Sequence, residues 1–172
     1  MKGFVSNFKA IIGKVGRADK RQRSRQQTPE SPPLRRVSSE KLQEILEVHR
    51  KWIESQGKEG EKADLSGTDL EGRNLNGANL AGADLEGVNL SRANLVKAKF
   101  SIPQPETATD YIAANLYGAK FEKADLAGAD LKGCALNNTN FRHANLKSAD
   151  LQSADLTGAD LQEAYRPVYR QV

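Results

Sequence analysis

The chain has 172 residues, which leaves room for one domain of ordinary size with extensions but not for a second, catalytic domain. Aromatic residues make up 6% of it and Trp occurs once, so a thick globular core of large side chains is excluded. The formal net charge of +4 is unevenly spread: residues 1–60 contain 14 Lys and Arg against 7 Asp and Glu, whereas residues 61–172 contain 12 against 15.

The first segment, residues 1–16, has the spacing of a basic amphipathic helix, with apolar side chains on one side and lysines on the other. Apolar side chains of this kind enter a membrane interface while basic ones meet anionic headgroups. We therefore expect this arm to dock on an anionic membrane surface or a protein partner. Nucleic acid is a less favoured partner, and a solubilising tail is the other alternative. The residues expected to make the contacts are Phe4, Phe8, Lys9, Ile11, Ile12, Lys14 and Arg17.

Residues 17–37 are rich in Arg and contain three prolines, which predicts a flexible, disordered linker. A helix is then predicted over residues 38–57, with Ser38 or Ser39 as its N-cap and Gly57 at its C-terminal end. One stripe of this helix needs an apolar surface to pack on, so we expect the helix to cap the region that follows. The expected contact residues are Leu46, His49, Trp52 and Ile53, and His49 is interpreted as a packing residue rather than a ligand.

From Ala63 the chain repeats every five residues, as in ADLSG, TDLEG, RNLNG and ANLAG, and after an interruption it resumes up to Leu161. A period of five fits neither a helix nor a strand, so each unit must contain a turn. The large central residue and the small residue two before it point inward and fill a narrow coil, while Gly, Ser and Asn after the centre provide turns. Representative central residues of the expected core are Leu65, Leu85, Phe100, Phe121, Phe141 and Leu161.

The tandem A(D/N)LxX pattern resembles the pentapeptide-repeat family from Ala63 to about Leu161. This resemblance implies an all-β solenoid, a right-handed quadrilateral β-helix with four repeats per coil. Residues 63–164 would then make about five coils. The resemblance implies no single function, because the family includes topoisomerase-binding DNA mimics, secreted effectors and many members of unknown role.

The interruption at residues 101–111 leaves two interpretations. A bulged coil with one degenerate repeat and a single extra residue would restore the frame and would place Phe100, Phe121, Phe141 and Leu161 in one stack; the pattern favours this alternative. The other is a loop excursion, because Pro103 and Pro105 cannot donate to a ladder. Residues 165–172 are expected to close the last coil as a C-terminal cap, or to pair with a second copy, through Tyr165, Val168 and Tyr169.

The sequence contains no recognised catalytic, nucleotide-binding or metal-binding motif, so we expect no catalytic residues, no cofactor and no metal. Cys134 takes the place of a small buried residue. We expect a non-enzymatic scaffold or adaptor that binds a protein through its solenoid surface, as a monomer or a C-terminal homodimer. The alternative is a DNA mimic that inhibits a topoisomerase or another DNA-handling enzyme. The expected location is the cytoplasm, with the arm holding the protein on the inner face of the membrane when it docks there.

Overall fold

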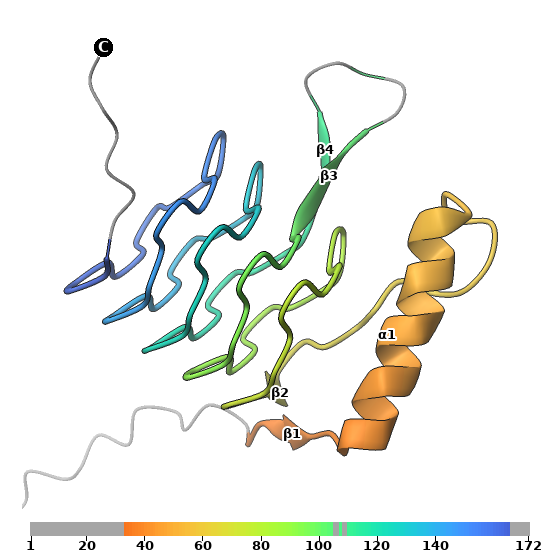
Figure 1. The fold of residues 1–172 in the computed structure, drawn as a ribbon, viewed down its shortest axis with the longest axis horizontal. Coiled ribbons are helices and arrows are strands. Elements are labelled where there is room, and N and C mark those ends of the chain that lie inside the picture. The colour runs from red at the N-terminus through yellow and green to blue at the C-terminus, as the bar shows by residue number, and fades with distance from the viewer. Residues whose placement is uncertain (1–32, 105–106, 108–109, 166–172) are drawn as a thin grey trace, which may run out of the picture. The chain divides into compact units, whose positions relative to one another are not determined.

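The computed structural model describes residues 33–104, 107 and 110–165, which belong to one compact unit. Five elements occur among these residues, in the order β1 (Arg35–Arg36), α1 (Ser39–Glu54), β2 (Thr68–Asp69), β3 (Ser101–Pro103) and β4 (Tyr111–Ala113). Most of the chain after α1 has no long strands. It winds as a stack of coils, with α1 beside the first coil and the β3–β4 hairpin projecting from the stack (Figure 1).

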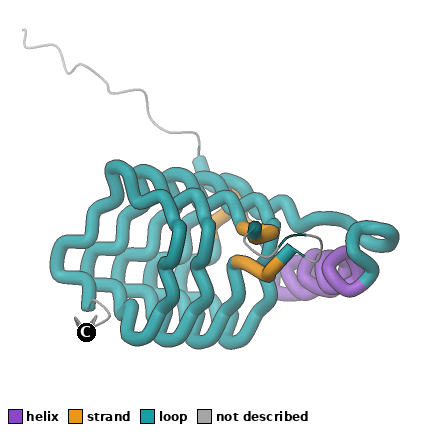
Figure 2. The backbone as a smooth tube through the Cα atoms, turned by 90° about the horizontal axis from the view of Figure 1, so that it is seen from above, coloured by secondary structure: helices purple, strands orange, loops and turns teal. Residues whose placement is uncertain are grey.

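Single-residue parallel bridges hold successive coils together at the Asp or Asn position of each repeat. Asp64 pairs with Asp84, and Asn115 pairs with Ala135, so each of these coils contains 20 residues and four repeats. The coils begin at Asp64, Asp84, Asn115, Ala135 and Asp155, and the last is described as far as Tyr165. Viewed from above, they lie side by side as a ladder of similar loops (Figure 2). The result is a β-helix whose hydrogen bonds run between coils.

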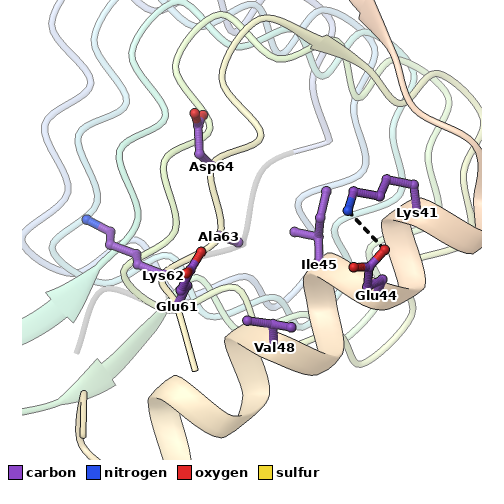
Figure 3. A pocket seen from close by; sticks show the side chains of 8 residues that line it. All are labelled: Lys41, Glu44, Ile45, Val48, Glu61, Lys62, Ala63 and Asp64. Carbon is purple, nitrogen blue, oxygen red and sulfur yellow. Dashed lines mark hydrogen bonds and ion pairs between the residues drawn. The ribbon is translucent and has the colours of Figure 1, made fainter. Parts of the chain in front are cut away.

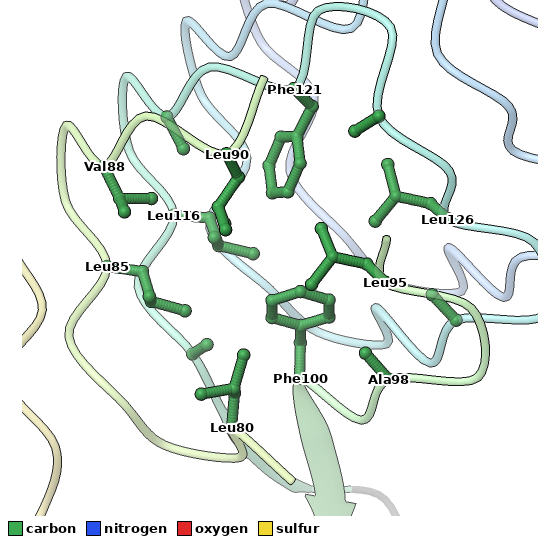
Figure 4. Close-up of a cluster of buried hydrophobic side chains, with 14 of the residues drawn as sticks. Leu80, Leu85, Val88, Leu90, Leu95, Ala98, Phe100, Leu116, Phe121 and Leu126 are labelled. Carbon is green, nitrogen blue, oxygen red and sulfur yellow. The ribbon is translucent and has the colours of Figure 1, made fainter. Parts of the chain in front are cut away.

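The interior of the coils is filled by the central residue of each repeat and by the small residue two before it. Central side chains from four sides of a coil meet in the middle, as the cluster around Phe100 and Phe121 shows (Figure 4). Phe121 and Phe141 stack with ring centroids 4.9 Å apart. Burial of these apolar side chains is the main source of stability, because each repeat has too little surface to fold alone. The predicted core residues Leu65, Leu85, Phe100, Phe121 and Phe141 are fully buried, whereas Leu161 in the last coil is half-buried.

Each repeat turns a corner immediately after its central residue. The backbone N–H three residues on donates to the carbonyl of the central residue, as Val88 does to Leu85 at 3.1 Å. The second residue after the centre has a positive φ, which is the signature of a type II turn and favours glycine. Gly87 meets this requirement with φ +63°, but Lys97 adopts φ +57° at the equivalent position. The repeat therefore tolerates side chains at a corner where they carry backbone strain.

The Asp or Asn before each centre has a structural role. Its Oδ1 accepts a hydrogen bond from the backbone N–H two residues on, as Asn94 does from Val96 at 3.2 Å. Where Asn follows Asp on the next coil, the amide also bonds the carboxylate: Asn89 Nδ2 donates to Asp69 Oδ1 at 2.9 Å. The column of short polar residues is thus part of the fold.

The coil that begins at Asp84 contains an insertion. Asp84 pairs with Asn115, 31 positions later, whereas pairs that do not span the insertion are 20 positions apart. The additional residues form the antiparallel hairpin β3–β4, in which Ile102 pairs with Ile112, and the coil resumes where Ala114 N donates to Phe100 O at 2.7 Å. The favoured bulged coil was therefore wrong, and the loop excursion describes this region. Phe100 stacks in register with Leu80 and Leu131 rather than with Phe121, because Lys99 pairs with Asn79 and Asp130.

The helix α1 packs against the first coil. Ser38 is its N-cap, with Oγ accepting from Lys41 N at 3.1 Å, and Leu42 is buried in the core cluster. Arg73 ties the start of the helix to the coil by donating to Val37 O at 2.8 Å and Ser39 Oγ at 2.6 Å. The predicted linker, residues 17–37, ends in the short strand β1, which pairs in parallel with β2.

Some predicted features lie outside the described residues. These are the amphipathic arm 1–16, linker residues 17–32 and C-terminal residues 166–172. Tyr165 is described, and it differs from the prediction: the residue is 57% exposed and does not close the last coil. Its backbone instead extends the ladder, because Leu146 N donates to Tyr165 O at 2.9 Å.

Candidate functional site

A groove lies between the C-terminal end of α1 and the β3–β4 hairpin. Its volume is about 580 Å³. The apolar lining consists of Trp52 and Ile53 from α1 and Ile102 and Ile112 from the hairpin, and the polar lining consists of Gln56, Gly57, Lys58 and Gln104. An apolar floor with a few polar groups at the edge is typical of a surface that binds a protein segment.

Close packing over Gly82 positions the two sides of the groove. Gly82 is buried at the corner of the first coil, with φ +75°. A Cβ at this residue would lie 2.9 Å from Ile112 Cγ2 and 3.3 Å from two ring atoms of Trp52. The absence of a side chain therefore lets the helix and the hairpin approach the same point of the coil.

The ring of His49 packs against the indole of Trp52. The two rings are stacked with centroids 5.6 Å apart and planes 10° apart. The imidazole is fully buried, and its Nδ1 accepts a hydrogen bond from Ala63 N at 3.1 Å. Burial lowers the pKa of His49, the positive charge of Lys62 lowers it further, and the Ala81 backbone opposes these effects more weakly. The histidine is therefore neutral near pH 7 and holds the helix on the coil.

A second, smaller hollow of about 240 Å³ lies between α1 and residues 61–64, which lead into the first coil (Figure 3). Ile45 and Val48 from the helix face Ala63, and the rim is charged. Lys41 and Glu44 at this rim pair with each other at 2.9 Å, and Asp64 interacts with Arg35 at 3.5 Å. Several of these charged groups are therefore already paired within the molecule. With its charged rim, this hollow is a weaker candidate for binding an apolar segment than the groove is.

Charge on the coils is mixed. Lys132 lies 3.2 Å from both Asp130 and Asp150, and Arg142 lies 3.3 Å from Asp160; the Lys132–Asp150 and Arg142–Asp160 pairs join neighbouring coils. The face with the bridging residues Asp64, Asp84, Asn115, Ala135 and Asp155 is the most acidic. Its carboxylates are on the first, second and last coils, and among the described residues the third and fourth coils add none to this face.

Cys134, which the sequence placed at a small buried position, has the environment of a core residue. Cys134 is buried, its Sγ lies 3.6 Å from Phe100 O, and burial raises the pKa of its thiol to about 12. Over the described ranges there is no cluster of three or more residues able to hold a metal ion. Within the same ranges no helix is both long and apolar enough to cross a membrane.

The structure brings together three of the four predicted cap residues. His49 stacks on Trp52, and Ile53 lines the groove together with Trp52. The fourth, Leu46, packs on the core. Sequence reasoning missed Ile102, Gln104 and Ile112. The available signal was Ile102 and Ile112, one β-branched residue near each end of the interruption, since such residues favour strands.

Comparisons with known proteins identify the repeats. The family model named Pentapeptide repeats matches eight copies over residues 63–101 and 124–162. A pentapeptide repeat protein from the thylakoid lumen of Arabidopsis thaliana has a solved structure that is 29% identical, with a TM-score of 0.51, over 59% of this chain and 63% of that chain. The likeness implies a right-handed β-helix.

Two cyanobacterial structures are also similar in sequence. Rfr23 from Cyanothece 51142 is 32% identical over 60% of each chain, with a TM-score of 0.35. HetL, which is involved in heterocyst differentiation regulation in Nostoc sp. strain PCC 7120, is 30% identical over 63% of this chain and 55% of its own, with a TM-score of 0.29. This chain thus spans between 55% and 63% of the length of these relatives. No curated protein matches it.

Proposed function

Because the repeat region of this chain belongs to the pentapeptide-repeat family, we propose that the protein is a non-enzymatic binding scaffold whose groove between α1 and the β3–β4 hairpin holds a protein partner. Members of this family are generally structural or binding proteins. The occupant is an extended segment of the partner with apolar side chains at its centre. Such a segment matches a floor of Trp52, Ile53, Ile102 and Ile112 and a rim with the amides of Gln56 and Gln104 and the cation of Lys58.

The main support for this proposal is that the five-residue repeat frame would be continuous without the hairpin. If Ser101 were joined directly to Ala113, Phe100 would precede Leu116 by five residues, as in every regular repeat. The hairpin is therefore an insertion at a corner of a coil, where loops with binding roles occur on rigid scaffolds. Its apolar residues face Trp52, whose residue type is enriched among the strongest contributors to protein interfaces.

Site-specific photo-crosslinking tests this proposal. A benzophenone-bearing residue at Gln104, in the groove, is expected to capture one specific protein in an extract of the source cells. The same residue at the exposed Gln152 is the control. The captured protein, once purified, is expected to bind the full chain and to bind Ile112→Asp at least tenfold more weakly. Equal affinity for the two chains would mean that the groove is not the binding surface.

The charge distribution favours a scaffold over the alternative, a DNA mimic that inhibits a DNA-handling enzyme. Mimicry needs one continuously negative face, because the inhibitor replaces a regular array of phosphates. On the most acidic face, Asp64, Asp84 and Glu86 are separated from Asp155 by two coils without a carboxylate on that face among the described residues. Asp64 also interacts with Arg35.

We also propose that the arm of residues 1–16 docks the protein on an anionic membrane or on a second partner. Support for this comes from the sequence alone, because these residues lie outside the described ranges. Co-sedimentation with anionic and neutral liposomes is the test. Binding of the full chain to anionic vesicles that falls with salt and is lost from a Phe4→Asp/Phe8→Asp variant is expected. If both chains remain in the supernatant, the arm does not bind membranes.

A further inference from the structure

The two ring nitrogens of His49 have different environments. Nδ1 accepts the hydrogen bond from Ala63 N at 3.1 Å, so in the neutral ring the proton resides on Nε2. Nε2 is buried and has no hydrogen-bond partner among the described residues. The surroundings of the His49 ring therefore favour the neutral imidazole with its proton on Nε2.

We propose that His49 is a pH-sensitive latch, and that protonation of its ring releases the C-terminal part of α1 from the first coil and moves Trp52 out of the groove. Protonation would place a second donor on Nδ1, directly facing the Ala63 N–H. The ring would lose a hydrogen bond and leave a positive charge buried without a counter-ion. Both effects oppose the docked position of the helix.

Among the described residues, the surroundings of the ring offer no counter-ion for that charge; the Ala81 backbone favours the protonated ring, but its effect is weaker than those of burial and Lys62. Lys62, on the segment between α1 and the first coil, has a charge of the same sign. The charged residues next to His49 on α1 are exposed, and Arg50 is paired with Glu47 at 2.6 Å and Glu54 at 2.5 Å. The first coil presents backbone and small apolar residues to the ring, including Ala63 and Ala81.

Trp52 couples the latch to the groove. One face of its indole lies on the imidazole, and its ring edge lies over Gly82. When the imidazole leaves its pocket, the indole loses its support and the groove loses one wall. The effect of acid on partner binding rests on the function proposed above, whereas the release of α1 does not.

The direction and size of the effect follow from proton linkage. The docked state has the lowered pKa and so binds fewer protons than the released state, whose histidine titrates near its ordinary value of about 6.5. The docking equilibrium constant is therefore unaffected well above that value. Below it, the constant falls by up to about tenfold per pH unit until the docked histidine also titrates.

Fluorescence of the full chain tests the latch without any partner, because Trp52 is the single Trp. Between pH 8 and pH 5 we expect its emission to move to longer wavelength and its quenching by acrylamide to increase. His49→Asn keeps an acceptor for Ala63 N but does not titrate, so its emission is expected to stay constant. His143→Asn removes the other histidine, which is exposed and lies 3.1 Å from Glu163, and is expected to keep the transition.

Constant wild-type emission, or the same transition in His49→Asn, would overturn the latch. If Asn leaves the helix undocked already at pH 8, nitrogen chemical shifts of the His49 ring in the wild-type chain decide. A neutral ring protonated at Nε2, with a pKa below 6.5, supports the latch. A pKa of 6.5 or higher overturns it. Either result leaves the crosslinking test of the groove unaffected.

Discussion

Asn115 and Asp84 lie opposite each other on successive coils, and Asn115 Nδ2 is 3.3 Å from Asp84 Oδ1 and 3.3 Å from Glu86 Oε2. One amide thus separates two carboxylates on the most acidic face of the solenoid. The pair shows how the ladder uses its two residue types: both Asp and Asn close the local turn, but Asn also donates to the coil before it.

Asn115→Asp is expected to destabilise the protein by about 1 kcal/mol at pH 7, because it replaces two hydrogen bonds with repulsion between like charges. Thermal unfolding should show this loss, and the loss should shrink in high salt, which screens exposed charges. Asn74→Asp is the matched control, since its partner on the next coil is Asn94. Equal destabilisation by the two substitutions would contradict a charge effect.

Gly82→Ala and Gly87→Ala separate backbone strain from packing at the groove. Both glycines have positive φ, but a Cβ at Gly87 meets nothing within 4 Å. Gly87→Ala should therefore cost only the strain of a left-handed residue, about 1 kcal/mol. Gly82→Ala should cost roughly 1 to 3 kcal/mol more, because Ile112 and Trp52 must move. Chemical unfolding measures both. Equal costs would show that helix and hairpin do not press on this corner.

Cys134 is expected to resist alkylation in the folded protein. Burial raises the pKa of its thiol to about 12, so little thiolate is present at pH 8, and reagents cannot reach it. The labelling rate measured with a thiol reagent should therefore rise only under conditions that open the coils. Rapid labelling at pH 8 without denaturant would contradict this, with free cysteine in the same buffer as the reference.

Periodicity predicted the inward-facing positions well because each five-residue unit has the same physical requirement. In each repeat the central residue, such as Leu85, is buried, and the corner residue, such as Gly87, adopts the positive φ of the turn. Each unit contacts mainly its neighbours in the stack, so local pattern and global fold agree. The inward positions could therefore be assigned by counting from Ala63.

Counting failed at the interruption. The bulged coil expected over residues 101–111 requires a degenerate repeat there, and Thr109, Asp110 and Tyr111 have the small, Asp, large order that such a repeat needs. In the structure Tyr111 lies in β4, half-buried outside the coil, where a Cβ at Gly133 would be 3.2 Å from its ring. An insertion that leaves and re-enters a coil at one corner can have any length, so sequence spacing does not set the register across it. The groove was missed for the same reason, since its walls come from segments about 50 positions apart.

If the β3–β4 hairpin serves binding and not folding, the solenoid should fold without it, and a deletion variant checks this. Removing residues 102–112 restores the five-residue frame, and Ala113→Gly supplies the residue that suits the new corner. We expect circular dichroism and thermal unfolding to show a folded solenoid whose melting temperature is within a few degrees of the full chain. The partner captured at Gln104 should bind this variant at least tenfold more weakly by calorimetry. A variant that fails to fold, or one that binds this partner as tightly as the full chain, would show that the hairpin does not have this role.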